Sequence, residues 1–302
     1  MSLVADALQP FLVTGLTSLQ GRPSGLSLVD LIGKQDRFGF DLDFDNSNES
    51  IVTDFRDPSP VLDSVASDSS RFASAAFQTM ESIPEAISGK DEIAWSIIRS
   101  YYAAFYAGHS ITRLFGESCS YFDRSHMARI SRLASAYGKT PNFNLHASVY
   151  RCNLDVSARC ITSKSLRNSQ GGAHETFWNI FGLRMSQIGE DILKGPLSQL
   201  ESQSVFSKLY NLQNSIGSNG APFHSWLSVM RNDIQYRHRY GVWLPCKVRR
   251  QDRERLGRLI GQWKRDPMDI DVGMSQGGPL GEFAVACAFI VALCRSLLNR
   301  ID

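Results

Sequence analysis

The chain has 302 residues, with 32 Lys and Arg against 30 Asp and Glu, so its formal net charge is only +2. A hydrophobic fraction of 43% and a charged fraction of 21% exclude a disordered, collagen-like or coiled-coil chain. The charge is nevertheless uneven: residues 1–70 carry eleven acids and four bases (−7), whereas residues 231–265 carry eleven bases and three acids (+8). This asymmetry fits either a polyanion partner near the second segment or two solvated faces of unlike charge.

The cysteines and apolar segments indicate an intracellular protein without a metal cluster. None of the six cysteines lies in a Cys-x-x-Cys pair or at zinc spacing from a histidine, so we expect no metal and no cofactor. The N-terminus lacks the features of a signal peptide. The longest apolar run, Phe283 to Cys294, has twelve residues, whereas a membrane span needs about 20. We therefore expect a cytoplasmic protein with reduced thiols and no membrane segment.

Residues 1–56 are predicted to form a small N-terminal α/β extension. Apolar residues at helical spacing follow Leu3, and Pro10 is a candidate kink. Phe38, Phe40, Leu42 and Phe44 alternate with polar residues or glycine, as in a half-buried strand, and a turn over residues 46–50 leads to a returning strand over residues 51–55. The extension therefore contains a β-hairpin.

Residues 57–302 are predicted to form a mainly α, bundle-like domain. The strongest helical pattern covers residues 90–115, with Gly116 as its stop. Residues 147–162 are ambiguous and are compatible with a hairpin. Other helices are expected at residues 60–80, 124–137, 174–193, 198–216, 222–238, 249–264 and 281–299.

The strongest candidate for chemistry is a pair of residues, Arg231 and His238, within the segment 226–241. If this segment is helical throughout, seven residues make about two turns, so both side chains share one face about 10 Å apart along the axis. A guanidinium can hold a phosphate through two hydrogen bonds, and an imidazole can transfer a proton near neutral pH. Phosphodiester cleavage needs both functions.

A second arginine–histidine match, Arg167 to His174, lies in a glycine-containing loop that leads into a helix. No apolar periodicity supports it, so it ranks below the first. His109, on the helix at residues 90–115, is expected to be a packed and hydrogen-bonded core residue rather than a functional one.

The segment Arg231-Asn232-x-Ile234-x-x-x-His238-x-Tyr240 resembles the signature of the HEPN superfamily, in which an arginine precedes a histidine by four to six residues and is commonly followed by asparagine. The segment 100–109, Ser-Tyr-Tyr-Ala-Ala-Phe-Tyr-Ala-Gly-His, is similar to the Tyr-Tyr-Ala-Ala-Phe helix of many such proteins. The two segments are separated by more residues than in a compact HEPN domain, which implies an insertion over 117–170. The extension 1–56 has no counterpart in the resemblance.

The resemblance implies a metal-independent endoribonuclease of a toxin–antitoxin, abortive-infection or other antiphage system, with a homodimer that brings two Arg/His pairs to one cleft. The RNA 2′-hydroxyl would be the nucleophile, and the products would be 2′,3′-cyclic phosphate and 5′-hydroxyl ends. His238 would act as general acid or base, Arg231 would bind the scissile phosphate, and Asn232 would orient one of these groups. A cognate antitoxin or defence partner would belong to such a system.

The basic segment that follows provides candidates for binding the RNA substrate, namely Arg237, Arg239, Tyr240, Arg249 and Arg250. The alternative for this segment is a solvated arginine-rich helix whose aromatic residues belong to the core.

Two other functions remain open at this stage. One is a non-catalytic HEPN-like module that binds RNA, nucleotide or a partner protein. The other is a helical scaffold or antitoxin-like subunit in which the Arg231–His238 spacing is accidental.

Overall fold

A computed structural model describes residues 2–16, 25–33, 39–83, 87, 92–167, 171–217, 224–243 and 246–301. The chain divides into two compact units, and each is assembled from segments that are distant in sequence. Unit 1 comprises Met1–Phe11, Phe72–Gly108 and Gly171–Arg300; unit 2 comprises Leu12–Arg71, His109–Gln170 and Ile301–Asp302.

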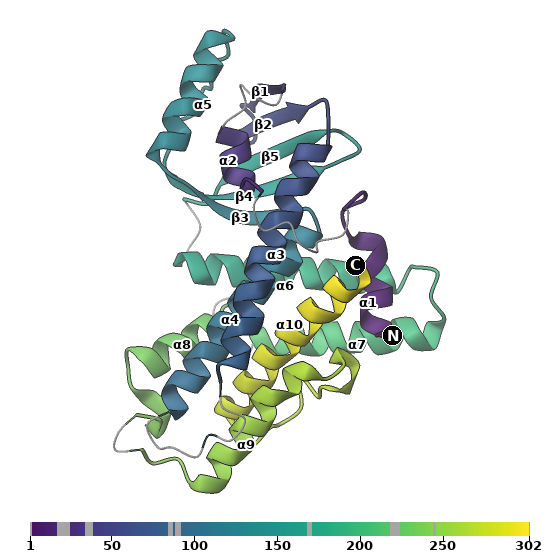
Figure 1. Cartoon of the computed structure of the whole chain (residues 1–302), viewed down its shortest axis with the longest axis vertical. Coiled ribbons are helices and arrows are strands. Elements are labelled where there is room, and N and C mark those ends of the chain that lie inside the picture. The colour runs from purple at the N-terminus through teal and green to yellow at the C-terminus, as the bar shows by residue number, and fades with distance from the viewer. Residues whose placement is uncertain are drawn as a thin grey trace. The chain divides into compact units, whose positions relative to one another are not determined.

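Two long helices contribute residues to both units, α3 (Ser59–Glu81) and α4 (Ile93–Leu114) (Figure 1). Unit 1 further contains α1 (Leu3–Leu8), α6 (Ala173–Ile192), α7 (Gln199–Ile216), α8 (Trp226–Gln235), α9 (Arg250–Gly261), α10 (Pro279–Ile301) and short 3-10 turns. Unit 2 contains α2 (Leu28–Gly33), α5 (Arg124–Ala136) and the strands β1 (Phe40–Asp45), β2 (Ser50–Phe55), β3 (Glu117–Phe122), β4 (Ser148–Asp155) and β5 (Cys160–Ser165).

The strands of unit 2 form one antiparallel sheet in the order β1-β2-β5-β4-β3. On β1, phenylalanine and leucine alternate with aspartate, so one face is buried and the acids point away from it. The turn to β2 is held by Asp45, whose carboxylate accepts the backbone N–H groups of Ser47 and Asn48 at 2.9 and 3.2 Å. The buried face packs against α2, α5 and the first part of α3.

This sheet joins two parts of the chain that the sequence analysis treats separately. The predicted N-terminal hairpin pairs through β2 with β5, which lies in the predicted insertion 117–170; Thr53 is opposite Ile161. The division of the chain therefore does not follow the predicted boundary at residue 56, because backbone pairing between distant strands places both segments in unit 2.

The mainly α class and most predicted helices are confirmed, and the ambiguous residues 147–162 belong to the hairpin β4–β5. As predicted, α4 stops just before Gly116, which has a φ of 75° that suits glycine. The helix predicted over 222–238 is wrong at its end, since α8 finishes at Gln235. Strand β3 and helix α2 were not predicted, and Phe38, assigned to the first strand, lies outside the described residues.

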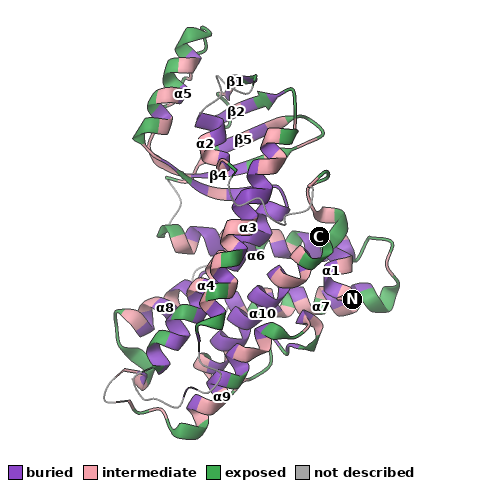
Figure 2. Ribbon diagram, viewed as in Figure 1, coloured by how far each residue is buried: buried purple, intermediate pink, exposed green. Residues whose placement is uncertain are grey.

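Helix α10 is the most deeply buried helix of unit 1, with every residue from Phe283 to Cys294 nearly inaccessible (Figure 2). Among the described residues it is the one helix long and apolar enough to cross a membrane, but 78% of its apolar window is buried within the protein. Burial on all sides explains its composition, because a central helix meets apolar neighbours in every direction.

In unit 2, the buried carboxylate of Asp68 connects three helices. Its oxygens accept the backbone N–H of Leu28 at 3.1 Å, pair with Arg71, and lie 3.7 Å from Nε of the buried Arg113. These groups replace the water that a buried carboxylate would otherwise need.

We predict that Asp68→Asn lowers the free energy of unfolding by about 3 kcal/mol, because it removes the negative charge that lies beside the buried guanidinium of Arg113. Denaturant unfolding followed by circular dichroism measures this change. The matched control is Asp41→Asn on the exposed side of β1, which should alter stability by less than about 0.5 kcal/mol. Equal effects of the two substitutions would contradict the role given to Asp68.

Candidate functional site

The candidate residues Arg231 and His238 do not share a helical face. Helix α8 ends at Gln235, and His238 adopts a left-handed backbone conformation with φ 51° and ψ 34°. Arg231 is buried, whereas His238 is exposed and stacks on Trp243 with ring centroids 5.4 Å apart. The assumption of a continuous helix is therefore wrong, and the two side chains lie in different environments.

The chain leaves the helix because a buried carboxylate near the end of α8 binds two later arginines. Asp233 accepts hydrogen bonds from Nη1 of Arg237 at 2.8 Å and Nη1 of Arg239 at 2.9 Å. The indole N–H of Trp243 donates to the backbone carbonyl of Ile234 at 2.6 Å, which satisfies an acceptor in the last helical turn. Together these contacts fold residues 236–243 back onto the end of α8.

Arg231 lies on the buried side of α8 against aromatic rings. Its Cζ is 5.3 Å from the ring centre of Tyr101, 5.8 Å from Tyr102 and 5.9 Å from Tyr236. Its Nη1 donates a long hydrogen bond of 3.5 Å to Gln235, and its Nε is buried without a hydrogen-bond partner. Within the described part of the chain, no carboxylate forms an ion pair with Arg231.

A histidine not selected from the sequence lies beside this arginine. His174, the second residue of α6, has its Nδ1 2.9 Å from the hydroxyl of Tyr101, and its ring stacks on Phe105 with centroids 4.2 Å apart. The indole N–H of Trp178 donates to the Tyr101 oxygen at 3.1 Å. The site therefore combines a guanidinium, a phenol and an imidazole from three helices, α8, α4 and α6. We call Tyr101, Tyr102, His174, Trp178 and Arg231 the Arg231 cluster.

The electrostatics of the Arg231 cluster favour the neutral forms of His174 and Tyr101. Burial, assisted by the positive charge of Arg231, lowers the pKa of His174 to about 4. Burial raises the pKa of Tyr101 to about 12, although Trp178 and Arg231 oppose this change. At neutral pH the cluster thus carries the uncompensated charge of Arg231, so it is suited to bind an anion. Tyr236, whose ring centre lies 5.9 Å from Cζ of Arg231, is 67% exposed, whereas Arg231 itself is only 7% exposed.

The remaining predicted catalytic residue, Asn232, is partly buried. Its backbone carbonyl accepts the N–H groups of Tyr236 at 2.9 Å and Arg237 at 3.3 Å. Asn232 therefore contributes to the end of α8, while Arg231 belongs to the buried cluster.

The predicted substrate-binding residues fall into two groups. Arg237 and Arg239 hold Asp233, as described above. Tyr240 and Arg249 line a pocket of about 300 Å³ together with Lys247 and Arg255, two further bases of the segment 231–265.

Three of the predicted substrate-binding side chains already have hydrogen-bond or ion-pair partners within the protein. The Tyr240 hydroxyl donates to Sδ of Met230 at 3.0 Å. Arg249 pairs with Asp252 at 3.0 Å, and Arg250 does not line the pocket but pairs with Glu254 at 2.8 Å. Arg249 and Arg250 are therefore paired locally, and the lining of the pocket around Tyr240 combines Lys247, Arg249 and Arg255 with Asp252.

The sequence contained signals for the missed residues. Tyr101 lies in the segment 100–109 that carries the family resemblance, and His174 was the histidine of the second arginine–histidine match. The structure places Arg167 of that match in unit 2 and His174 in unit 1. His109 is buried and bonded to Arg113, as expected for a core histidine.

Comparisons with models of known protein families, with curated proteins and with solved structures found no match for this chain. The function proposed below therefore depends on the chemistry of the residues just described.

We predict that Asp233→Asn lowers the free energy of unfolding by about 2 kcal/mol, because the buried site loses the charge that holds Arg237 and Arg239. Denaturant titration measures the loss. Asp252→Asn, which breaks a largely exposed pair with Arg249, is the control and should cost less than about 0.5 kcal/mol. If Asp233→Asn lowers the free energy of unfolding no more than Asp252→Asn does, Asp233 does not hold residues 236–243 against the end of α8.

The lowered pKa of His174 predicts an acid-dependent loss of stability. In the unfolded chain this histidine binds a proton near pH 6.5, whereas in the folded chain it does so only near pH 4. Its contribution is therefore fully present above pH 6.5 and declines as the pH falls to 4, by on the order of 2 kcal/mol. The free energy of unfolding should depend less steeply on pH in His174→Asn than in the wild type over this range. Equal slopes would contradict a buried, neutral His174.

Proposed function

We propose that the chain is a metal-independent endoribonuclease of a bacterial defence or toxin system, similar in kind to HEPN proteins and acting in the cytoplasm. The observation that supports this most directly is the buried guanidinium of Arg231, which has no described carboxylate partner and lies beside a phenol and an imidazole. Such a group can bind a phosphodiester and offset the negative charge that develops during cleavage.

In the proposed reaction, the RNA 2′-hydroxyl attacks the phosphate held by Arg231, and the 5′-oxygen leaves. A base takes the proton of the 2′-hydroxyl and an acid gives a proton to the leaving 5′-oxygen; a histidine performs one of these transfers, and the other histidine or a water molecule performs the second. The products have 2′,3′-cyclic phosphate and 5′-hydroxyl ends. His238 is the histidine of the resemblance and is exposed, so it is accessible to substrate or to a second protomer of the proposed homodimer. His174 is the histidine that shares an environment with Arg231.

A bound phosphate would change the state of His174 in the direction that catalysis needs. The charge of Arg231 contributes to the low pKa of this histidine, and a phosphate would offset that charge and favour the imidazolium. His174 could then donate a proton to the leaving oxygen although it is neutral in the empty site.

A second candidate function is a non-catalytic module that binds RNA, a nucleotide or another phosphate-bearing partner. It is favoured by the low pKa of His174 in the empty site and by the separation of His238 from the buried environment of Arg231. A cognate antitoxin or defence protein is a possible partner in either case.

The decisive experiment incubates the purified full-length protein with RNA in EDTA and maps the ends of the products. We expect cleavage that survives chelation and is reduced about 100-fold or more by Arg231→Ala. Loss of a proton-transferring histidine should cost about 100- to 10,000-fold, so His174→Ala and His238→Ala identify which one acts. Lys194→Ala, an exposed residue of unit 1, is the control and should leave the rate unchanged.

Two outcomes would reject cleavage by this site. Activity that requires added Mg²⁺ or Mn²⁺ would exclude the metal-independent mechanism. RNA binding that is weakened by Arg231→Ala, without cleavage under any condition, would support the non-catalytic module instead. Circular dichroism of each variant checks that the fold is retained.

A further inference from the structure

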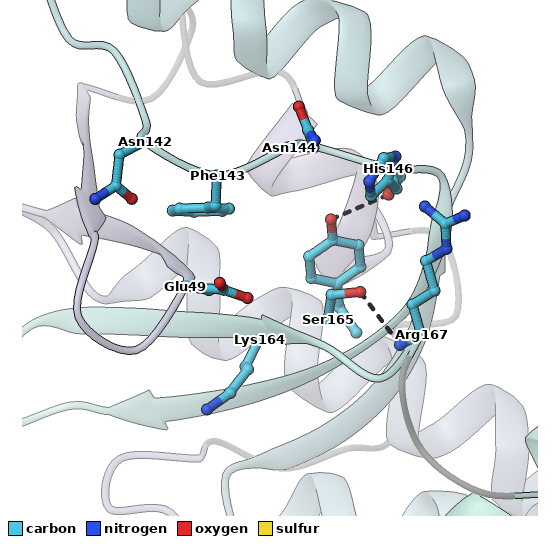
Figure 3. Close-up of a pocket in the computed structure, with 9 residues that line it drawn as sticks. Glu49, Asn142, Phe143, Asn144, His146, Lys164, Ser165 and Arg167 are labelled. Carbon is cyan, nitrogen blue, oxygen red and sulfur yellow. Dashed lines mark hydrogen bonds between the residues drawn. The ribbon is translucent and has the colours of Figure 1, made fainter.

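Unit 2 contains a pocket that takes no part in the proposed RNA cleavage. It has a volume of about 580 Å³, within the range of small-molecule sites. The lining residues come from the β1–β2 turn, the loop before β4, and strands β4 and β5 with the residues that follow: Glu49, Asn142, Phe143, Asn144, His146, Tyr150, Lys164, Ser165 and Arg167 (Figure 3).

The walls of the pocket are held by contacts between these segments. The N–H of Asn142 donates to the side-chain oxygen of Asn46 at 2.9 Å, which fixes the loop to the β1–β2 turn. The buried Tyr150 donates its hydroxyl hydrogen to the carbonyl of His146 at 3.0 Å. Glu49 occupies a left-handed position with φ 51° at the end of the β1–β2 turn. The pocket therefore has a defined shape on the sheet.

The two sides of the pocket differ in chemistry. Phe143, Asn142 and Glu49 lie on one side in Figure 3, while His146 and Arg167 lie on the other. Phe143 packs edge-to-face against Phe44, with ring centroids 5.9 Å apart, so the core contact fixes the orientation of its ring. Neither Arg167 nor Glu49 forms an ion pair with another described residue.

We propose that this pocket binds a single nucleotide. The base stacks on Phe143, and the phosphate binds to the guanidinium of Arg167 next to His146. The amide of Asn142 and the carboxylate of Glu49 contact the edge of the base. Because a carboxylate accepts two adjacent N–H donors well, guanine is preferred over uracil, which does not present such a pair.

Other ligand classes fit less well. A sugar phosphate would use Arg167 but not the aromatic side of the pocket. An acidic peptide would use the cationic groups but would be repelled by Glu49. A nucleotide can contact the ring of Phe143, the amide of Asn142, the carboxylate of Glu49 and the guanidinium of Arg167 at the same time.

The proposal is tested by isothermal titration calorimetry of the full-length protein with GMP and UMP. We expect GMP to bind, and UMP to bind at least about tenfold more weakly. Phe143→Leu, which keeps the apolar contact but removes the stacking ring, and Arg167→Ala should each weaken GMP binding about tenfold or more. Glu49→Gln should reduce the preference for GMP over UMP.

Control variants distinguish this site from general charge effects and from the Arg231 cluster. Arg132→Ala removes an exposed cation of α5 that does not line the pocket, and it should change GMP affinity less than about twofold. Arg231→Ala should leave GMP binding to the pocket intact, so failure of the proposed ribonuclease activity would not affect this result. Thermal unfolding of each variant confirms that the fold is retained.

Three results would overturn the proposal. The first is the absence of GMP binding by the wild type. The second is GMP binding that Phe143→Leu and Arg167→Ala leave unchanged in folded protein. The third is binding of a ten-nucleotide RNA, lost in these variants, without measurable binding of GMP; the pocket would then bind a strand rather than a free nucleotide.

Discussion

The candidate site depends on the burial of one positive charge without a described carboxylate to neutralise it. A guanidinium in such a position has lost much of its hydration, and aromatic rings with one long hydrogen bond replace only part of that loss. The buried Nε of Arg231 remains without a hydrogen-bond partner. An anion that reached this group would supply both the missing charge and the missing acceptor. The geometry is thus more favourable with an anion bound than without one.

The same charge influences the protonation of the groups around it, although burial has the larger effect on their pKa values. Together with burial, it lowers the pKa of His174, so that this side chain is neutral. It also counteracts part of the rise in the pKa of Tyr101 that burial causes. An anion on Arg231 would offset the contribution of this charge to both pKa values, while the larger contribution of burial would remain. Binding and protonation at this site are therefore linked, even though the histidine and the arginine belong to different helices.

The sequence predicted local structure better than it predicted the site. Most helices were predicted because their apolar periodicity and their stop signals, such as Gly116, lie within a short stretch of sequence. The pairing of β2 with β5 depends on residues about a hundred positions apart, which no local pattern reveals. The prediction for the end of α8 was wrong for a related reason. Asp233 is compatible with a helix in the sequence, but its burial and its ion pairs with Arg237 and Arg239 form only in the folded chain. His174 was missed because its neighbour Tyr101 is distant in sequence.

Many charged side chains of the two segments of unlike charge have structural roles. In the acidic segment, Asp68 connects buried helices, Asp6 pairs with Arg300 and Asp43 pairs with Lys139. Asp45 and Asp57 accept backbone N–H groups in turns. In the basic segment, four arginines pair with nearby acids, namely Arg237, Arg239, Arg249 and Arg250. Their partners, Asp233, Asp252 and Glu254, are the three acids already counted in the net charge of +8, so this pairing leaves the surplus of bases in the segment unchanged. Arg253 is also buried without an ion pair to a described carboxylate, and its Nε, like that of Arg231, has no hydrogen-bond partner. What distinguishes Arg231 is that a phenol and an imidazole, those of Tyr101 and His174, lie beside it.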